Sequence, residues 1–224
     1  MLDEARSAAA GAGQVLAGAA KTVATLRTAA KPLHPRGTVW SGALVRQGGS
    51  SGVHWLDEPG TDDAVVRLSR AAGLPATWPD VHGLAVRVLG EDGGIADILL
   101  ATTGAGPVGR FVLHAGRRPE AMFFGSLLPY RTTMGPVSLG ALRRDNASWN
   151  LMWAVGRAPW TPFARLVLWE RTPAEDISFD PVLNRPAGLE QYDALARLRL
   201  PAYRTARRTR GDSIAEPVPG TERP

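Results

Sequence analysis

The 224-residue chain is long enough for one well-buried core and too short for two full domains with linkers. Its composition, 44% hydrophobic and 21% charged, is that of a globular protein and excludes a chain that is disordered throughout. The absence of cysteine excludes disulfides, thiolate metal sites and a cysteine nucleophile, and it fits a reducing cytoplasm; the net charge of +5 comes mainly from arginines, several of which cluster after residue 196.

The first 30 residues predict a helical arm. They are rich in alanine, and apolar residues recur at steps of three and four, as on one face of a helix. We expect this arm to pack on the main domain or on a second subunit; a loosely ordered arm is the alternative. Acidic residues near the start argue against a secretory signal. The sequence has no apolar run of about 20 residues, so we expect no membrane-spanning helix. The recurring apolar residues are Val15, Leu16, Ala19, Val23 and Leu26.

Residues 31–209 are expected to form one mainly β domain. Short segments rich in β-branched and aromatic residues alternate with glycine, proline and aspartate, which favours an antiparallel sandwich or barrel. A turn at 185–188 and one apolar face beyond it predict a C-terminal helix, and residues 210–224 read as a disordered tail. The expected strands are 38–45, 53–56, 64–69, 84–89, 95–102, 110–114, 137–142, 149–155 and 164–169.

Four stretches, in one order along the chain, together resemble the core of the haem catalases. That order reduces the chance of coincidence, although each string alone is weak. The match covers roughly two-thirds of the chain, with no counterpart of the long threading arm or helical region of a full catalase. The stretches are 31–37, 65–69 with 79–88, 91–100, and 166–168 leading through Phe179-Asp180-Pro181 to 199–203 and Arg208.

The resemblance implies an α+β fold that is mainly β: a catalase-like antiparallel barrel with an N-terminal and a C-terminal helix. It implies haem b as cofactor, a peroxide as substrate and a homo-oligomer formed through the N-terminal arm. By matching position, Tyr203 is the axial ligand of the haem iron. Arg199 and Arg208 are the flanking arginines, and Arg199 would stabilise the phenolate, since an unperturbed phenol has a pKa of about 10.

On the opposite side of the haem, the resemblance places His34 as the acid/base residue that moves a peroxide proton. The hydroxyl of Ser69 would orient its ring. Guanidinium groups suit the haem propionates, so Arg67 and Arg208 are matched to them, with Lys31 where the family usually has arginine. Ala101 and Thr102 fall where the family has an asparagine, and neither replaces its amide fully.

Three other interpretations remain open. Four histidines with nearby aspartates allow a metal-dependent phosphodiesterase-like hydrolase, although no pair has the spacing of a known metal motif. A non-catalytic haem-binding or degenerate barrel protein is the second. The third, nucleic-acid binding by the C-terminal arginines, is least favoured because only one aromatic residue accompanies them. A G-x-G-x-x-G string at 104–109 is interpreted as a turn between strands, not as a dinucleotide site.

Overall fold

The computed structural model describes residues 37–71, 75, 77–90, 93–172 and 177–193. The expected arm at 1–30 and tail at 210–224 lie outside these ranges, so the domain boundaries stay predictions. Lys31, His34, Arg199, Tyr203 and Arg208 also lie outside them. Of the residues matched to the haem catalases as site residues, the described part contains Arg67 and Ser69.

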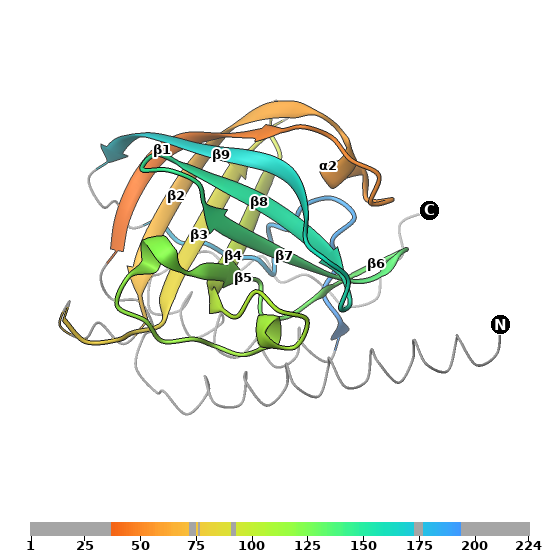
Figure 1. Ribbon diagram of the computed structural model, residues 1–224. Coiled ribbons are helices and arrows are strands. Elements are labelled where there is room, and N and C mark those ends of the chain that lie inside the picture. Colours follow the sequence, from red (N-terminus) through yellow and green to blue (C-terminus); the bar gives the residue numbers. More distant parts are fainter. Residues whose placement is uncertain (1–36, 72–74, 76, 91–92, 173–176, 194–224) are drawn as a thin grey trace.

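The described residues form a mainly β fold with a few short helical turns (Figure 1). Seven of the nine predicted strands are confirmed, and each extends by one to four residues beyond its predicted range at one or both ends. The strands are β1 Gly37–Arg46, β2 Gly60–Arg70, β3 His82–Leu89, β4 Ile95–Thr103, β5 Phe123–Gly125, β6 Tyr130–Thr132, β7 Gly135–Arg143, β8 Ser148–Val155 and β9 Thr161–Thr172; the turns are α2 His54–Asp57, η1 Gly109–Phe111 and η2 Pro119–Ala121.

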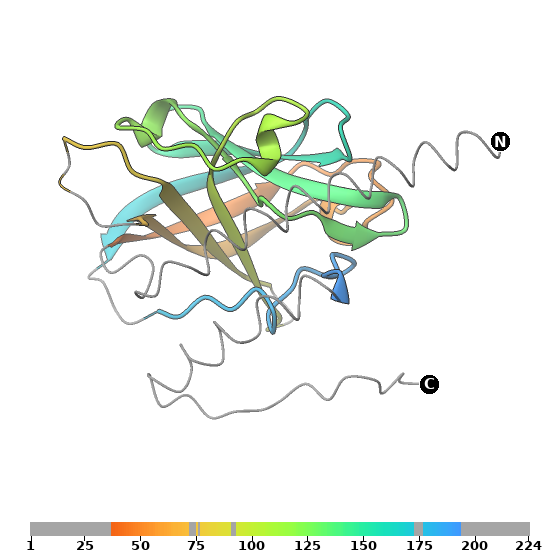
Figure 2. The same ribbon diagram turned by 90° about the horizontal axis from the view of Figure 1, so that it is seen from below.

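The strands close into an eight-stranded antiparallel barrel with β6 as an extra strand. Neighbours in the sheet follow the order β5-β4-β3-β2-β1-β9-β8-β7, and β5 also pairs with β7, which joins the two ends of the sheet. Closure removes the unpaired edges that an open sheet would expose. The segment 177–193 runs across the outside of the barrel (Figure 2).

Alternating side chains fill the barrel interior. In β3, Leu84, Val86 and Val88 point into the core, and the residues between them point outward. Opposite them in β2, Val66 pairs with Val86 and also belongs to the core. The β-branched and aliphatic residues of the predicted strands therefore supply the closed apolar core.

Two predicted strands are wrong. Residues 53–56 form the start of the short helix α2, because the Asp57 carboxylate accepts backbone hydrogen bonds from Ser51 (2.6 Å) and Gly52 (2.8 Å), which favours a turn. Residues 110–114 begin within the 3₁₀ turn η1 and rejoin the sheet only at Leu113, which bridges Thr103. The glycine-rich turn at 104–109 is confirmed, with no α-helix following it in the described chain.

Two other segments differ from, or add to, the expectation. Residues 189–192 are not helical: Leu189 packs into the core, and Glu190 bridges Arg131 of β6. The rest of the predicted C-terminal helix lies outside the described ranges. The stretch 126–132, which lies between two predicted strands, makes a corner: Leu127 has φ of 59°, and the Ser126 hydroxyl donates to the Leu128 carbonyl at 3.0 Å.

Candidate functional site

The outer face of β1–β4 carries the two predicted site residues that the structure describes. Along β2, Ala64 and Val66 point into the core, so Arg67 and Ser69 point outward, since strand side chains alternate. The two residues therefore share one face, as a common site requires. We call the outward residues of β1–β4 around them the outer face.

One row across the outer face consists of small residues. Because a Cβ added at Gly37 would lie 2.7 Å from the Arg67 Nε and 2.9 Å from the Leu68 carbonyl oxygen, a larger residue there would displace its neighbours. The side chains of this row are small on four adjacent strands, which is what close approach of a flat molecule would require. Its members, in register from β1 to β4, are Gly37, Ser69, Gly83 and Ala101.

The next row places one cation among apolar residues. Arg67 pairs with Val39 on one side and Ala85 on the other, and Leu99 follows on β4. Burial lowers the pKa of the Arg67 guanidinium from its ordinary value, but arginine stays charged at neutral pH. A partly desolvated cation beside a flat row suits a planar ligand that carries a carboxylate.

The structure separates Ala101 from Thr102. Ala101 belongs to the outer face, whereas Thr102 points inward and is fully buried. The Thr102 hydroxyl donates to the His114 carbonyl at 2.6 Å and accepts from the His82 backbone N–H at 3.1 Å. That hydroxyl is used inside the barrel, so it does not stand in for an asparagine amide on the outer face. The outer face has only a methyl group at this position.

A buried carboxylate attaches the segment 177–193 to the outer face. Asp97 is 0% exposed and accepts both Nε and Nη2 of Arg87 at 2.7 Å. The same carboxylate accepts the Asp180 backbone N–H at 2.7 Å and the Asn184 side-chain amide at 2.8 Å. The hydrogen bonds raise the pKa of Arg87, and its guanidinium lies 5.3 Å from the centre of the Phe179 ring. This network fixes the segment that the sequence places before Arg199 and Tyr203.

The histidines of the described ranges do not assemble into a metal site. No cluster of three or more metal-ligating His, Asp or Glu side chains occurs among the described residues. His54 forms a surface pair with Glu58 at 2.8 Å, and His82 is buried with its Nε2 2.9 Å from the Gly116 carbonyl oxygen. The described part of the chain therefore offers no support for the hydrolase interpretation.

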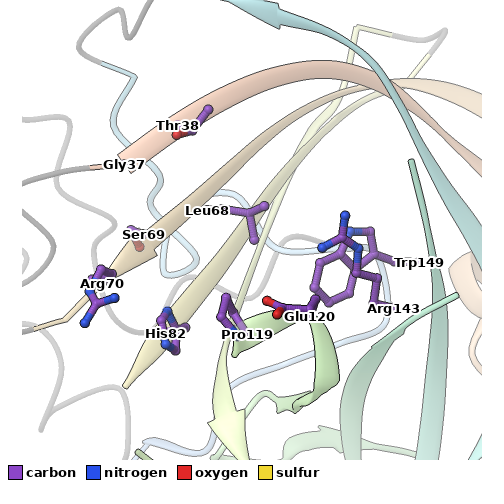
Figure 3. A pocket seen from close by; sticks show the side chains of 10 residues that line it. All are labelled: Gly37, Thr38, Leu68, Ser69, Arg70, His82, Pro119, Glu120, Arg143 and Trp149. Carbon is purple, nitrogen blue, oxygen red and sulfur yellow. The ribbon is translucent and has the colours of Figure 1, made fainter. Parts of the chain in front are cut away.

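A second site, which the sequence did not reveal, is a pocket of about 370 Å³ at one end of the barrel (Figure 3). The starts of β1, β3 and β8 and the ends of β2 and β7 form it, together with the turn η2. No sequence motif could reveal it, because its residues come from five strands and a turn. The lining residues are Gly37, Thr38, Leu68, Ser69, Arg70, His82, Pro119, Glu120, Arg143 and Trp149.

The fold is shared with catalases. A bacterial catalase superimposes with a TM-score of 0.58 at 15% identity, and catalase A from Saccharomyces cerevisiae with 0.57 at 13%. Both alignments cover 85% of this chain but only 60% and 64% of the catalase chains, so this chain spans less than two-thirds of their length. No family model and no curated protein sequence matches it. Within the described ranges, no helix has the length and apolar character needed to cross a bilayer. The chain has a catalase-like β-barrel fold.

Proposed function

We propose that the outer face of β1–β4 is one wall of a haem site and that the protein is a haem-binding oxidoreductase acting on a peroxide. The observation that carries the proposal is the row of small residues beside Arg67 on four adjacent strands. A flat macrocycle with carboxylates needs a shallow surface and a cation at its rim, and the described residues fit both needs. The catalase-like fold supports the same assignment.

In this proposal Tyr203 ligates the iron, with Arg199 beside it, and Arg67, Arg208 and Lys31 hold the propionates. Haem b would supply the iron at which the peroxide O–O bond is cleaved. The His34 imidazole would move the peroxide proton, and the Ser69 hydroxyl would hold its ring. Ser69 pairs with Gly37 in the small row, and Gly37 follows His34 by three residues in the sequence. The protein would be a cytoplasmic homo-oligomer.

The methyl group of Ala101 affects which peroxide we expect as the substrate. A methyl group cannot donate a hydrogen bond to a bound peroxide, and it occupies less space than an amide side chain. We therefore propose that hydrogen peroxide dismutation is slow and that an organic hydroperoxide is accepted. The variant Ala101→Asn is expected to raise hydrogen peroxide turnover relative to turnover of cumene hydroperoxide. An unchanged ratio of the two rates would contradict this assignment of Ala101.

The primary test is a haem titration of the full chain, followed by absorption spectroscopy of the wild type and Tyr203→Phe. We expect a ferric Soret band in the wild type that is shifted or lost in the variant. Tyr192→Phe is the matched control and should leave the band unchanged. Arg67→Gln is expected to weaken haem binding at least about tenfold, since a charge-assisted hydrogen bond contributes roughly 1.5–3 kcal/mol.

The outcomes separate the interpretations. No haem uptake by the folded wild type would refute the proposal. Haem uptake with an unchanged spectrum in Tyr203→Phe would refute Tyr203 as the ligand. Haem uptake without turnover of either peroxide would leave a haem carrier and refute the peroxide activity.

A further inference from the structure

The pocket at the end of the barrel borders the outer face, since Gly37 and Ser69 of the small row line it, but its charged and apolar groups come from other residues. Leu68 belongs to the inner face of β2, where it packs on the core, whereas Arg67 points outward. Arg70 is two residues further along the same inner face, and Trp149 is 2% exposed within the core of β8. The pocket is thus the polar end of the barrel interior, with an apolar base.

Two oppositely charged side chains of the pocket have no ionic partner among the described residues. The Arg143 guanidinium donates to the backbone carbonyls of Asp145 (2.8 Å) and Asn146 (2.9 Å), and no carboxylate pairs with it in the described chain. Glu120 on η2 lines the same pocket, is exposed, and forms no ion pair with a described residue. A ligand with both charges would satisfy both groups.

The second arginine of the pocket is already occupied. The Arg70 Nη2 donates to the carbonyls of Pro75 (3.1 Å) and Trp78 (2.8 Å), and its Nε lies 3.5 Å from the Asp80 carboxylate. Its charge is therefore largely balanced by Asp80. The charges left for a ligand are one cation, Arg143, and one anion, which favours a ligand with no net charge.

A buried histidine adds an acceptor to the pocket. His82 is 4% exposed, and its Nε2 lies 2.9 Å from the Gly116 carbonyl oxygen, so Nε2 carries the proton in this contact. In the neutral ring, the other nitrogen, Nδ1, is then an acceptor, and it makes no hydrogen bond within the described part of the chain. Figure 3 shows the His82 ring among the side chains that line the pocket.

We propose that this pocket binds a small zwitterion of the α-amino acid type with an apolar side chain. The carboxylate binds the Arg143 guanidinium, and the ammonium group binds Glu120 and the His82 Nδ1 acceptor. The apolar group lies against Leu68 and Trp149. The pocket volume, about 370 Å³, is at the lower end of the range for small-molecule sites, which suits a ligand of this size. The pocket shares Gly37 and Ser69 with the proposed haem wall, but none of the groups that would bind the zwitterion belongs to the haem proposal.

The test is isothermal titration calorimetry of the full chain with three matched probes. L-phenylalanine carries both charges, 3-phenylpropionate lacks the ammonium group, and 2-phenylethylamine lacks the carboxylate. We expect L-phenylalanine to bind at least about tenfold more tightly than either partial probe, because each charge-assisted hydrogen bond adds roughly this factor. L-leucine replaces the ring by a smaller apolar group in a parallel titration.

Two variants assign the charges. Arg143→Gln should weaken L-phenylalanine and 3-phenylpropionate about tenfold but leave 2-phenylethylamine unchanged. Glu120→Gln should weaken L-phenylalanine and 2-phenylethylamine, and remove the advantage of L-phenylalanine over 3-phenylpropionate. Arg144→Gln and Glu170→Gln are the matched controls, since both residues are exposed and outside the pocket.

Several results would overturn the proposal. These are no binding of either amino acid to the folded wild type, equal affinity for the three probes, or equal losses in the control variants. Repeating the titration with and without haem separates the two proposals, because a protein that takes up no haem should still bind L-phenylalanine.

Discussion

The carboxylate of Asp97 is the most sharply testable feature of the fold. It is 0% exposed, and it receives hydrogen bonds from Arg87, from the Asp180 backbone and from the Asn184 amide. The variant Asp97→Ala removes the acceptor of all of them. The Arg87 side chain, which is only 20% exposed, then keeps its positive charge without the Asp97 carboxylate as its ion-pair partner.

Removing one member of a buried ion pair costs about 3–5 kcal/mol, because the remaining charge stays desolvated without a partner. We expect Asp97→Ala to lower the free energy of unfolding by an amount in this range. The double variant Arg87→Ala/Asp97→Ala leaves no unpaired charge. Its loss should therefore be smaller than the sum of the two single losses by about 1 kcal/mol or more.

Urea denaturation followed by circular dichroism measures these changes, and an unchanged m-value shows that the same surface unfolds in each variant. Asp63→Ala is the matched control: Asp63 is an exposed carboxylate on β2, and its removal should change the stability by less than about 0.5 kcal/mol. A loss below about 1 kcal/mol in Asp97→Ala, or additive losses in the double variant, would refute the reasoning.

Burial raises the pKa of Asp57, but hydrogen bonds from neighbouring backbone groups outweigh it and leave the pKa below the usual 3.8. The wild type should therefore be more stable than Asp57→Asn at neutral pH, and this difference should disappear as pH falls through the lowered pKa. Thermal unfolding of both proteins across pH 2–7 measures the difference. Gly42→Ala should destabilise strongly, since its Cβ would lie 2.2 Å from the Val167 carbonyl oxygen, whereas Gly106→Ala meets nothing within 4 Å and should be neutral in urea denaturation. Arg110→Lys should cost about 1–3 kcal/mol in the same assay, because lysine cannot reproduce the guanidinium hydrogen bonds to the carbonyls of 106, 156 and 158.

The sequence predicted the long strands well, because each has enough alternating apolar residues to identify one buried face. β3 and β4 begin or end within two residues of their predicted bounds. The three-residue strands β5 and β6 were missed, since so short a segment contains no periodic pattern. Their place in the sheet depends on pairing with β7, which only the closed barrel provides.

The wrong strands have a local cause. The apolar run at 53–56 reads as a strand, but the Asp57 side chain bonds the backbone before it and stabilises a helical turn. The run at 110–114 contains Phe111 and Leu113, which favour a strand. The buried Arg110 guanidinium, however, donates hydrogen bonds to backbone carbonyls in the hairpin between β8 and β9, and this holds the start of the run outside the sheet. In both segments, hydrogen bonding of a polar side chain overrides the β preference of the apolar residues.

The fold class, most strand positions and the shared face of Arg67 and Ser69 follow from the sequence pattern. Their spacing of two places both on one face of a strand, because side chains alternate along it. The faces that Ala101 and Thr102 occupy were known only from the folded barrel, since the outer row is defined by register across four strands. The folded barrel alone also assembles the pocket of Arg143, Glu120 and His82. Barrel closure brings those residues together from distant parts of the chain, and no local pattern encodes that closure.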